Sequence, residues 1–209
     1  MKKLILISLI VSSLTGYFAQ ADELADNSVE ESSQTDLPSA KKTHVESRAI
    51  GLSSIQWNEP LILKQAGKKE TDVANYSGLA LSYQKEFTYY HWGWNVGGFL
   101  ATGRANGGGN STITYQKDKQ SFTMVALTPR AFYRLTGRVN VGVSALIYYR
   151  NIDWPTDTAG LTVDATRNFA LTALADINVR LSDSFDFYQG LGPLDQGSTF
   201  WKIGLAYRF

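Results

Sequence analysis

The sequence contains no cysteine and only two histidines. Without cysteine the chain can form neither a disulfide nor a lipoprotein anchor, which requires a lipidated cysteine. His44 and His91 stand far apart and have no cysteine beside them, so the sequence predicts no metal site and no cofactor. A net charge of +1 lacks the basic excess typical of a nucleic-acid-binding protein, and we expect no nucleic-acid partner.

Long apolar runs are also missing. The segment 4–14 is too short to span a membrane as a helix, which needs about 20 apolar residues. It follows Lys2 and Lys3 and precedes Ala19-Gln20-Ala21, a pattern typical of a secretory signal peptide over 1–21. Residues 22–44 are acidic and poor in apolar side chains, which predicts a disordered periplasmic leader. A solvated spacer and a partner-binding or peptidoglycan-proximal tail are the two interpretations of this leader.

The end of the chain alternates with a period of two. Large apolar residues recur at every second position, and small, polar or mixed residues lie between them. Such a strand has one apolar face. In a soluble protein an unpaired edge on this strand would promote aggregation. Closure into a barrel removes the edge by pairing the last strand with the first. The apolar positions are Trp201, Ile203, Leu205, Tyr207 and Phe209.

Similar patterns upstream predict an all-β domain over 45–209, an eight-stranded antiparallel transmembrane β-barrel. Pro129 lacks a backbone donor, so we expect a bulge or break there. The first strand alternates poorly, since Ile50 and Leu52 share one face and Ile55 and Trp57 the other, and its facing stays open. The expected strands are 46–57, 76–87, 92–103, 120–135, 139–150, 168–180, 185–191 and 199–209.

The connections between these strands alternate in length. Long segments are expected at 58–75, 104–119 and 151–164, and short turns near 88–91, 136–137 and 182–184. This asymmetry is typical of outer-membrane barrels, whose periplasmic turns are short and whose extracellular loops are long. Aromatic residues near strand ends predict interfacial girdles. Those assigned to the inner rim are Tyr83, Phe87, Tyr133, Phe185, Tyr207 and Phe209, and those assigned to the outer rim are Trp57, Tyr149, Trp154 and Trp201.

From about Val45 to Phe209 the chain resembles the small OmpA/OmpX-like barrels of bacterial outer membranes. The resemblance rests on the alternating strands and on the terminal phenylalanine with apolar residues two, four, six and eight positions before it. It implies a monomer in the outer membrane, in contact with lipid and lipopolysaccharide. It also implies that periplasmic chaperones escort the chain and that the barrel assembly machinery recognises the terminal strand.

The inward positions carry charges that must pair in a narrow barrel, because eight strands leave room only for side chains. When residues are counted from the expected periplasmic turns, Arg130 and Asp176 lie at a similar depth in the barrel. The charges could form a structural plug, or they could line a polar conduit or a small-ligand pocket. The predicted lumen charges are Arg130, Arg150, Asp176, Arg180, Asp186, Lys202 and Arg208.

Three classes of function remain, and the sequence favours a structural, surface-interaction or membrane-integrity role. The first alternative is a narrow channel or small-ligand transport barrel. The second is a lipid-modifying enzyme, which is disfavoured because His44 lies in the leader and His91 at an expected periplasmic turn. Gly107-Gly108-Gly109 is no phosphate loop, since it lacks the following Lys-Ser/Thr. We therefore expect no catalytic residue.

Overall fold

A computed structural model describes residues 44–115, 120–152, 154, 160–164, 168–194 and 198–209. The chain divides into two compact units, residues 1–41 and residues 42–209, and the first lies outside the described residues. The signal peptide and nearly all of the acidic leader therefore stay predictions. No helix in the described residues is long and apolar enough to cross a membrane.

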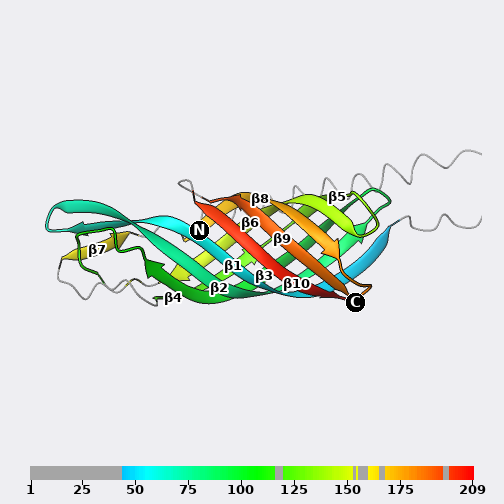
Figure 1. The fold of residues 1–209 in the computed structure, drawn as a ribbon, viewed down its shortest axis with the longest axis horizontal. Coiled ribbons are helices and arrows are strands. Elements are labelled where there is room, and N and C mark those ends of the chain that lie inside the picture. The colour runs from blue at the N-terminus through cyan, green and yellow to red at the C-terminus, as the bar shows by residue number, and fades with distance from the viewer. Residues whose placement is uncertain (1–43, 116–119, 153, 155–159, 165–167, 195–197) are drawn as a thin grey trace, which may run out of the picture. The chain divides into compact units, whose positions relative to one another are not determined.

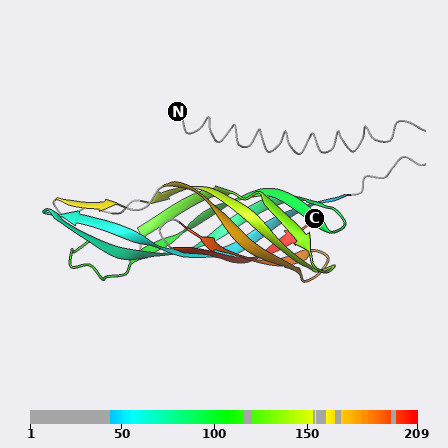
Figure 2. The same cartoon turned by 90° about the horizontal axis from the view of Figure 1, so that it is seen from above.

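The second unit consists of antiparallel strands that close into one ring (Figures 1 and 2). Around the ring the order is β1, β2, β3, β4 with β5, β6, β8, β9 and β10, and β10 pairs with β1. The ring has eight positions because β4 and β5 together fill one of them. The strands are β1 (Val45–Gln65), β2 (Lys68–Thr88), β3 (Trp92–Gly107), β4 (Gln120–Leu127), β5 (Arg130–Arg134), β6 (Val139–Ile152), β7 (Leu161–Asp164), β8 (Phe169–Arg180), β9 (Phe185–Pro193) and β10 (Thr199–Arg208).

Closure occurs between the two terminal strands, as the sequence predicts. The register runs from Ala49 opposite Arg208 to Gln56 opposite Trp201. The last residue extends the ladder, because the Phe209 N–H donates to the Arg48 carbonyl at 2.9 Å and the Arg48 N–H donates to the Phe209 carbonyl at 3.1 Å. No strand edge is left where the ring closes, which is what a barrel surrounded by lipid requires.

The expected interruption at Pro129 is present. Strands β4 and β5 both pair with β3 and with β6, and they are separated by Thr128 and Pro129. The Thr128 N–H donates to the Gly97 carbonyl at 2.8 Å, and the Pro129 carbonyl accepts from the Ala145 N–H at 2.9 Å. These bonds hold the strand in the ring although proline cannot donate to the ladder.

The segment 58–75 is not the long polar loop that we expected. It forms the upper part of a long hairpin, in which β1 and β2 have 21 residues each and pair from Val45–Thr88 to Gln65–Lys68. Ala66 and Gly67 make the turn, both with positive φ, which suits glycine at the second position. We call this end of the barrel the hairpin end, and the opposite end, with Phe209 and the short connections, the turn end (Figure 1).

The other two expected long loops also contain strand. Strand β3 continues to Gly107, and β7 pairs with β1 in the register Ile62–Asp164 to Gln65–Leu161. Strand β7 lies outside the eight-position ring and covers the β1 edge that β10 leaves free. The sequence did not predict these extensions because their outward side chains are mostly polar, as they would be in an exposed loop.

The facing of β1 is regular, and the apparent break in its pattern has a physical cause. Even-numbered residues point outward and odd-numbered residues inward along the strand. Near the turn end the outward Ile50 and Leu52 are exposed, whereas nearer the hairpin end the inward Ile55 and Trp57 are buried. The strand therefore passes from a region with an apolar outside to one with an apolar inside.

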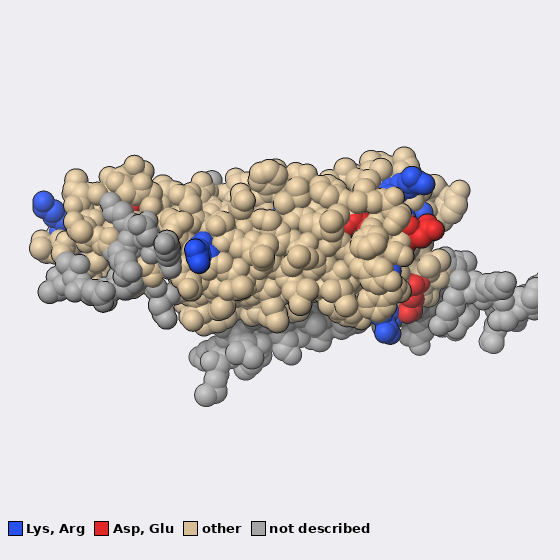
Figure 3. Space-filling model, turned by 60° about the horizontal axis from the view of Figure 1, so that its bottom comes forward, with Lys and Arg blue, Asp and Glu red and all other residues tan. Residues whose placement is uncertain are grey.

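An apolar belt surrounds the ring between its two ends. Figure 3 shows that Lys, Arg, Asp and Glu gather towards the ends of this face, while the surface between them is almost free of charge. Crossing a membrane takes about 9–11 residues of a tilted strand, so β1 and β2 are roughly twice as long as needed. The belt includes the exposed side chains Leu52, Leu79, Leu81, Val96, Leu100, Val125, Val143, Leu171, Leu191 and Leu205.

The aromatic girdle agrees with the expectation only in part. Tyr149 and Trp201 are exposed on the belt side, as expected. Trp57 and Trp154 are buried among other apolar side chains instead. Both belong to the core at the hairpin end, so their assignment to an interfacial girdle was wrong.

The belt supports a direct test of facing. Replacing Val143, which is exposed on β6, with arginine should cost roughly 2–4 kcal/mol of unfolding free energy, because a charge would enter the bilayer midplane. Equilibrium urea unfolding in lipid vesicles measures this loss. Ser144 is the matched control, since it is buried on the inner face and its substitution acts through crowding instead. A barrel that tolerates arginine equally well at both positions would refute the facing.

Candidate functional site

The inside of the barrel carries charged side chains at three levels. At the turn end, Arg208 donates to Glu86 and to Ser47, at 2.9 Å each, and to Asp186. Arg180, which is partly exposed, has its Nε 3.8 Å from Asp186. Glu86 and Asp186 are both buried, and the Arg208 guanidinium forms an ion pair with each of them. This cluster closes the turn end with paired charges.

A second cluster lies at the level of the apolar belt. Arg130 Nε donates to Asp176 Oδ1 at 2.5 Å, and Ser144 Oγ donates to Asp176 Oδ2 at 2.5 Å. Both Asp176 oxygens are thus engaged. The Arg130 guanidinium also lies 4.7 Å from the centre of the Phe132 ring.

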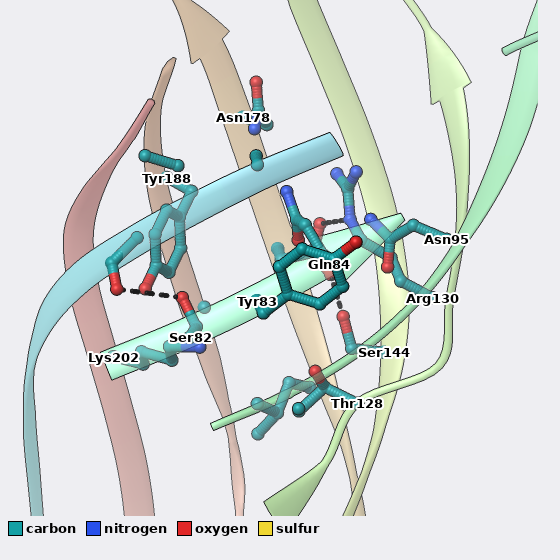
Figure 4. Close-up of a pocket in the computed structure, with 17 residues that line it drawn as sticks. Ser82, Tyr83, Gln84, Asn95, Thr128, Arg130, Ser144, Asn178, Tyr188 and Lys202 are labelled. Carbon is teal, nitrogen blue, oxygen red and sulfur yellow. Dashed lines mark hydrogen bonds and ion pairs between the residues drawn. The ribbon is translucent and has the colours of Figure 1, made fainter. Parts of the chain in front are cut away.

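Lys202 reaches the same level from β10. Its Nζ lies 4.5 Å from the ring centre of Phe99 and 4.9 Å from that of Tyr188, within cation–π range. The residue is 9% exposed. Lys202, Arg130, Ser144 and Tyr188 all line one cavity in the lumen (Figure 4).

An aromatic layer fills the barrel towards the hairpin end. Trp57 stacks on Tyr76 with ring centres 4.6 Å apart, and Phe122 meets Trp57 edge-on at 5.0 Å. The ring centre of Phe200 lies 5.8 Å from that of Trp57. All four residues are nearly fully buried and come from β1, β2, β4 and β10. Their rings therefore block the lumen from several directions.

A buried ion pair sits against this layer. Arg150 Nη1 donates to Glu59 Oε2 at 2.7 Å, and Arg150 is 0% exposed. The guanidinium lies 5.2 Å from the ring centre of Tyr76, which adds a cation–π contact. Because both charges are removed from water, each depends on the other.

The structure thus distributes the seven predicted lumen charges over three levels. Arg130 meets Asp176, and Arg180 and Arg208 meet Asp186. Arg150 stands apart from these, and no ion pair with a carboxylate is seen for Lys202 among the described residues. Sequence reasoning missed Glu59 and Glu86. The sequence analysis placed Glu59 in a loop. The register of β1 with β2 instead makes it a strand residue that faces inward.

Two carboxylates hold the β3–β4 connection against the hairpin. Glu70 accepts from Ser111 Oγ and the Thr112 N–H at 2.7 Å each, and also from Thr112 Oγ1. Asp72 accepts from the N–H groups of Gly109 at 3.0 Å and Asn110 at 3.1 Å. The loop is therefore fixed over β2, where β3 no longer covers its edge.

These bonds change the acidity of both carboxylates, which lie beyond the apolar belt. The hydroxyl and backbone donors of Thr112, together with Ser111, lower the pKa of Glu70 to about 2. Burial opposes ionisation of Asp72, but bonds from Tyr115, Val73, Asn110 and Gly109 outweigh it and lower its pKa. Burial and the neighbouring Asp72 raise the pKa of the Tyr115 hydroxyl, which therefore stays a donor.

The depressed pKa predicts an acid-resistant loop. A carboxylate whose pKa is lowered in the folded state stabilises it above the ordinary pKa, and this contribution is lost as the pH falls through the lowered value. The NMR shift of the Thr112 amide should therefore titrate near pH 2. In Glu70→Gln the titration of the Thr112 amide should disappear. The Gly109 amide donates to Asp72, so its shift should still titrate with that carboxylate. A Thr112 midpoint at the ordinary glutamate value would refute the contact.

Comparisons with known proteins assign no family to this chain. No family model matches the sequence, and no curated protein is similar to it in sequence. Among solved structures, the attachment invasion locus protein Ail of Yersinia pestis is 18% identical with a TM-score of 0.42, covering 77% of this chain and 98% of its own. OprG of Pseudomonas aeruginosa is 13% identical with a TM-score of 0.45, covering 78% and 95%. Neisserial surface protein A is 10% identical with a TM-score of 0.37, covering 77% and 97%.

The ring and its apolar belt give this chain the architecture of a small outer-membrane β-barrel. Because β10 pairs with β1, the antiparallel ring has no unpaired strand edge where it closes, and the apolar belt surrounds it. Both are what a lipid environment demands of a spanning structure. The expected eight-stranded antiparallel barrel is thus confirmed. Function has to be argued from this chain's own residues.

Proposed function

We propose that this chain is a monomeric outer-membrane barrel with a structural or surface-interaction role, whose hairpin end faces the outside of the cell. The observation that carries the proposal is the aromatic layer of Trp57, Tyr76, Phe122 and Phe200 across the lumen. A continuous water path would have to pass these buried rings and the paired charges at two further levels. A filled barrel can support a rigid surface but is a poor conduit.

The hairpin end is built as such a surface. The long β1–β2 hairpin, strand β7 and the loop held by Glu70 and Asp72 form one hydrogen-bonded assembly beyond the apolar belt. Side chains below it form an apolar core, so the surface does not rest on flexible loops alone. A pre-ordered surface loses little conformational entropy on contact with a partner, which favours binding. Outer-membrane lipid and lipopolysaccharide are the partners that its position implies.

An enzymatic role finds less support among the described residues. His91 is exposed at the turn end, where the Arg134 N–H donates to its carbonyl at 2.8 Å. His44 precedes β1 at the same end and lies 3.6 Å from Glu46. Neither imidazole is placed at the hairpin end, where a lipid-modifying enzyme of the outer leaflet would need its base.

Conductance and labelling test the proposal together. Refolded protein in planar bilayers should show no discrete single-channel openings, and lipid A mass should be the same in cells with and without the protein. On intact cells, Lys68 and Lys69 and the Gly107–Gly109 segment should react with protease or label, whereas Thr136-Gly137 and Asp183 should not. Asp157, also expected outside, lies outside the described residues. Stable conductance would favour the channel alternative, and the reverse labelling pattern would overturn the orientation.

The terminal residue allows the assembly role to be separated from stability. Phe209 is 57% exposed and lies beside Tyr207, with ring centres 6.3 Å apart. Because so much of its ring faces outward, and alanine keeps both backbone bonds to Arg48, Phe209→Ala should refold nearly normally from urea into detergent. In cells we expect the variant to reach the outer membrane poorly, since recognition by the assembly machinery would be lost.

Heat-modifiable migration on gels reports folding in both settings. Phe185→Ala is a suitable control, because Phe185 is also exposed near the turn end but is not terminal. Normal outer-membrane levels of Phe209→Ala would refute the assembly role. Failure to refold in vitro would show that Phe209 serves stability instead.

A further inference from the structure

The lumen contains a cavity at the level of the apolar belt, with a volume of about 60 Å³. Residues of β1, β2, β3, β5, β6, β8, β9 and β10 surround it (Figure 4). Since one water molecule occupies about 30 Å³ in the liquid, the cavity has room for a ligand no larger than a few atoms.

The charges around this cavity do not balance. Two cations, Arg130 and Lys202, and one carboxylate, Asp176, line it. Both oxygens of Asp176 are taken, one by Arg130 and the other by Ser144. Among the described residues no carboxylate oxygen forms an ion pair with the Lys202 ammonium, which lies against the faces of Phe99 and Tyr188. A buried cation in this position is costly unless an anion accompanies it.

Two donors without an acceptor at the same cavity reinforce this preference. Asn95 is 2% exposed, and its Nδ2 finds no acceptor among the described residues. The Nη2 of Arg130 is buried and likewise lacks an acceptor, although Nε of the same guanidinium is paired. Figure 4 shows Asn95 and Arg130 side by side at the cavity. Buried donors are satisfied in most native structures, so these atoms call for an acceptor of their own.

We propose that the cavity is a binding site for one small monovalent anion of the size of chloride. The ammonium of Lys202 supplies the charge, and Asn95 Nδ2 and Arg130 Nη2 supply hydrogen bonds. An anion suits the site because the unpaired charge is the cation Lys202 and because Asn95 Nδ2 and Arg130 Nη2 are unpartnered donors, although Asn178 Oδ1 on the same lining is an unpartnered acceptor. The cavity volume requires that the ligand be small. The site would complete the charge balance inside the barrel, independently of any role for its surface.

The test is equilibrium urea unfolding of refolded protein in vesicles, with chloride replaced by gluconate at constant ionic strength. Urea is required because guanidinium chloride would supply the ligand. Once chloride exceeds its dissociation constant, each further tenfold rise should lower the unfolding constant of the wild type about tenfold, as for any ligand that binds only the folded state. Bromide should act like chloride and give an anomalous diffraction peak in the cavity, whereas gluconate is too large to enter.

Two variants and a control make the assignment specific. Lys202→Met keeps the side-chain length without the charge, and Asn95→Asp places a carboxylate in the cavity, so both should lose the chloride dependence. The second variant decides the matter if the first does not fold. Lys64→Met, at the exposed hairpin, should keep the dependence. A wild type that is indifferent to chloride would mean that water alone fills the cavity, and a dependence that survives in both cavity variants would place the anion elsewhere. Either result overturns the proposal.

Discussion

Arg150→Met is expected to lower the free energy of unfolding by about 3–5 kcal/mol, the usual cost of leaving one member of a buried ion pair without its partner. Arg150 is fully buried, and Glu59, its partner at 2.7 Å, is 4% exposed. Methionine fills much of the same volume, so the loss reports the uncompensated Glu59 carboxylate more than a cavity. The contact between the guanidinium and Tyr76 is lost as well.

A double variant separates charge from packing. Arg150→Met combined with Glu59→Leu removes both charges, and replacing a whole buried pair by apolar side chains is often nearly neutral. We therefore expect the double variant to recover most of the stability that the single variant loses. Arg104→Met, at an exposed position on β3, is the control and should change little. Urea unfolding in vesicles measures all three, and equal losses in the single and double variants would contradict the charge argument.

Trp57→Ala should cost about 3–5 kcal/mol, because it removes a large aromatic side chain from a packed core. Trp57 is 4% exposed and contacts Tyr76, Phe122 and Phe200. Few surrounding groups can collapse into the space, since the neighbouring rings are anchored on different strands of a closed barrel. The effect should appear as a lower urea midpoint.

Trp201 is the matched control for Trp57. It has the same side chain but is 43% exposed on the outer face of β10, so Trp201→Ala should cost clearly less. The pair distinguishes a tryptophan of the core from one of the interfacial girdle, which the sequence alone did not separate. Equal losses at the two positions would mean that Trp57 is not the centre of the aromatic layer.

Both predictions bear on the proposed role. If the aromatic layer and the Arg150–Glu59 pair contribute this much, the hairpin end is a folded core and not a set of mobile loops. The proposed surface is then held rigid by residues inside the barrel. Conductance recorded for Trp57→Ala beside the wild type would show whether the same residue also keeps the lumen closed.

Much of the barrel can be predicted from the sequence, and the reason is local. Within a membrane the outer face of a strand must be apolar, so strict alternation reveals facing directly. This holds for β6, β8 and β10, where Val143, Ala173 and Leu205 face outward as predicted. Closure of the ring follows from the same requirement, and the break at Pro129 follows from a missing backbone donor.

The tertiary structure alone decides what lies beyond the belt and which charges meet. Above the membrane the outside becomes polar and the inside apolar, so the pattern of β1 and β2 changes sign and their continuation resembles a loop. Trp57 and Glu59 become core residues because the ring and the strand register enclose them. Glu59 meets Arg150 across 91 positions of sequence, and Glu86 meets Arg208 across 122. Alternation gives the face on which a side chain lies, but only the stagger of strands around a closed barrel determines its depth and therefore its partner.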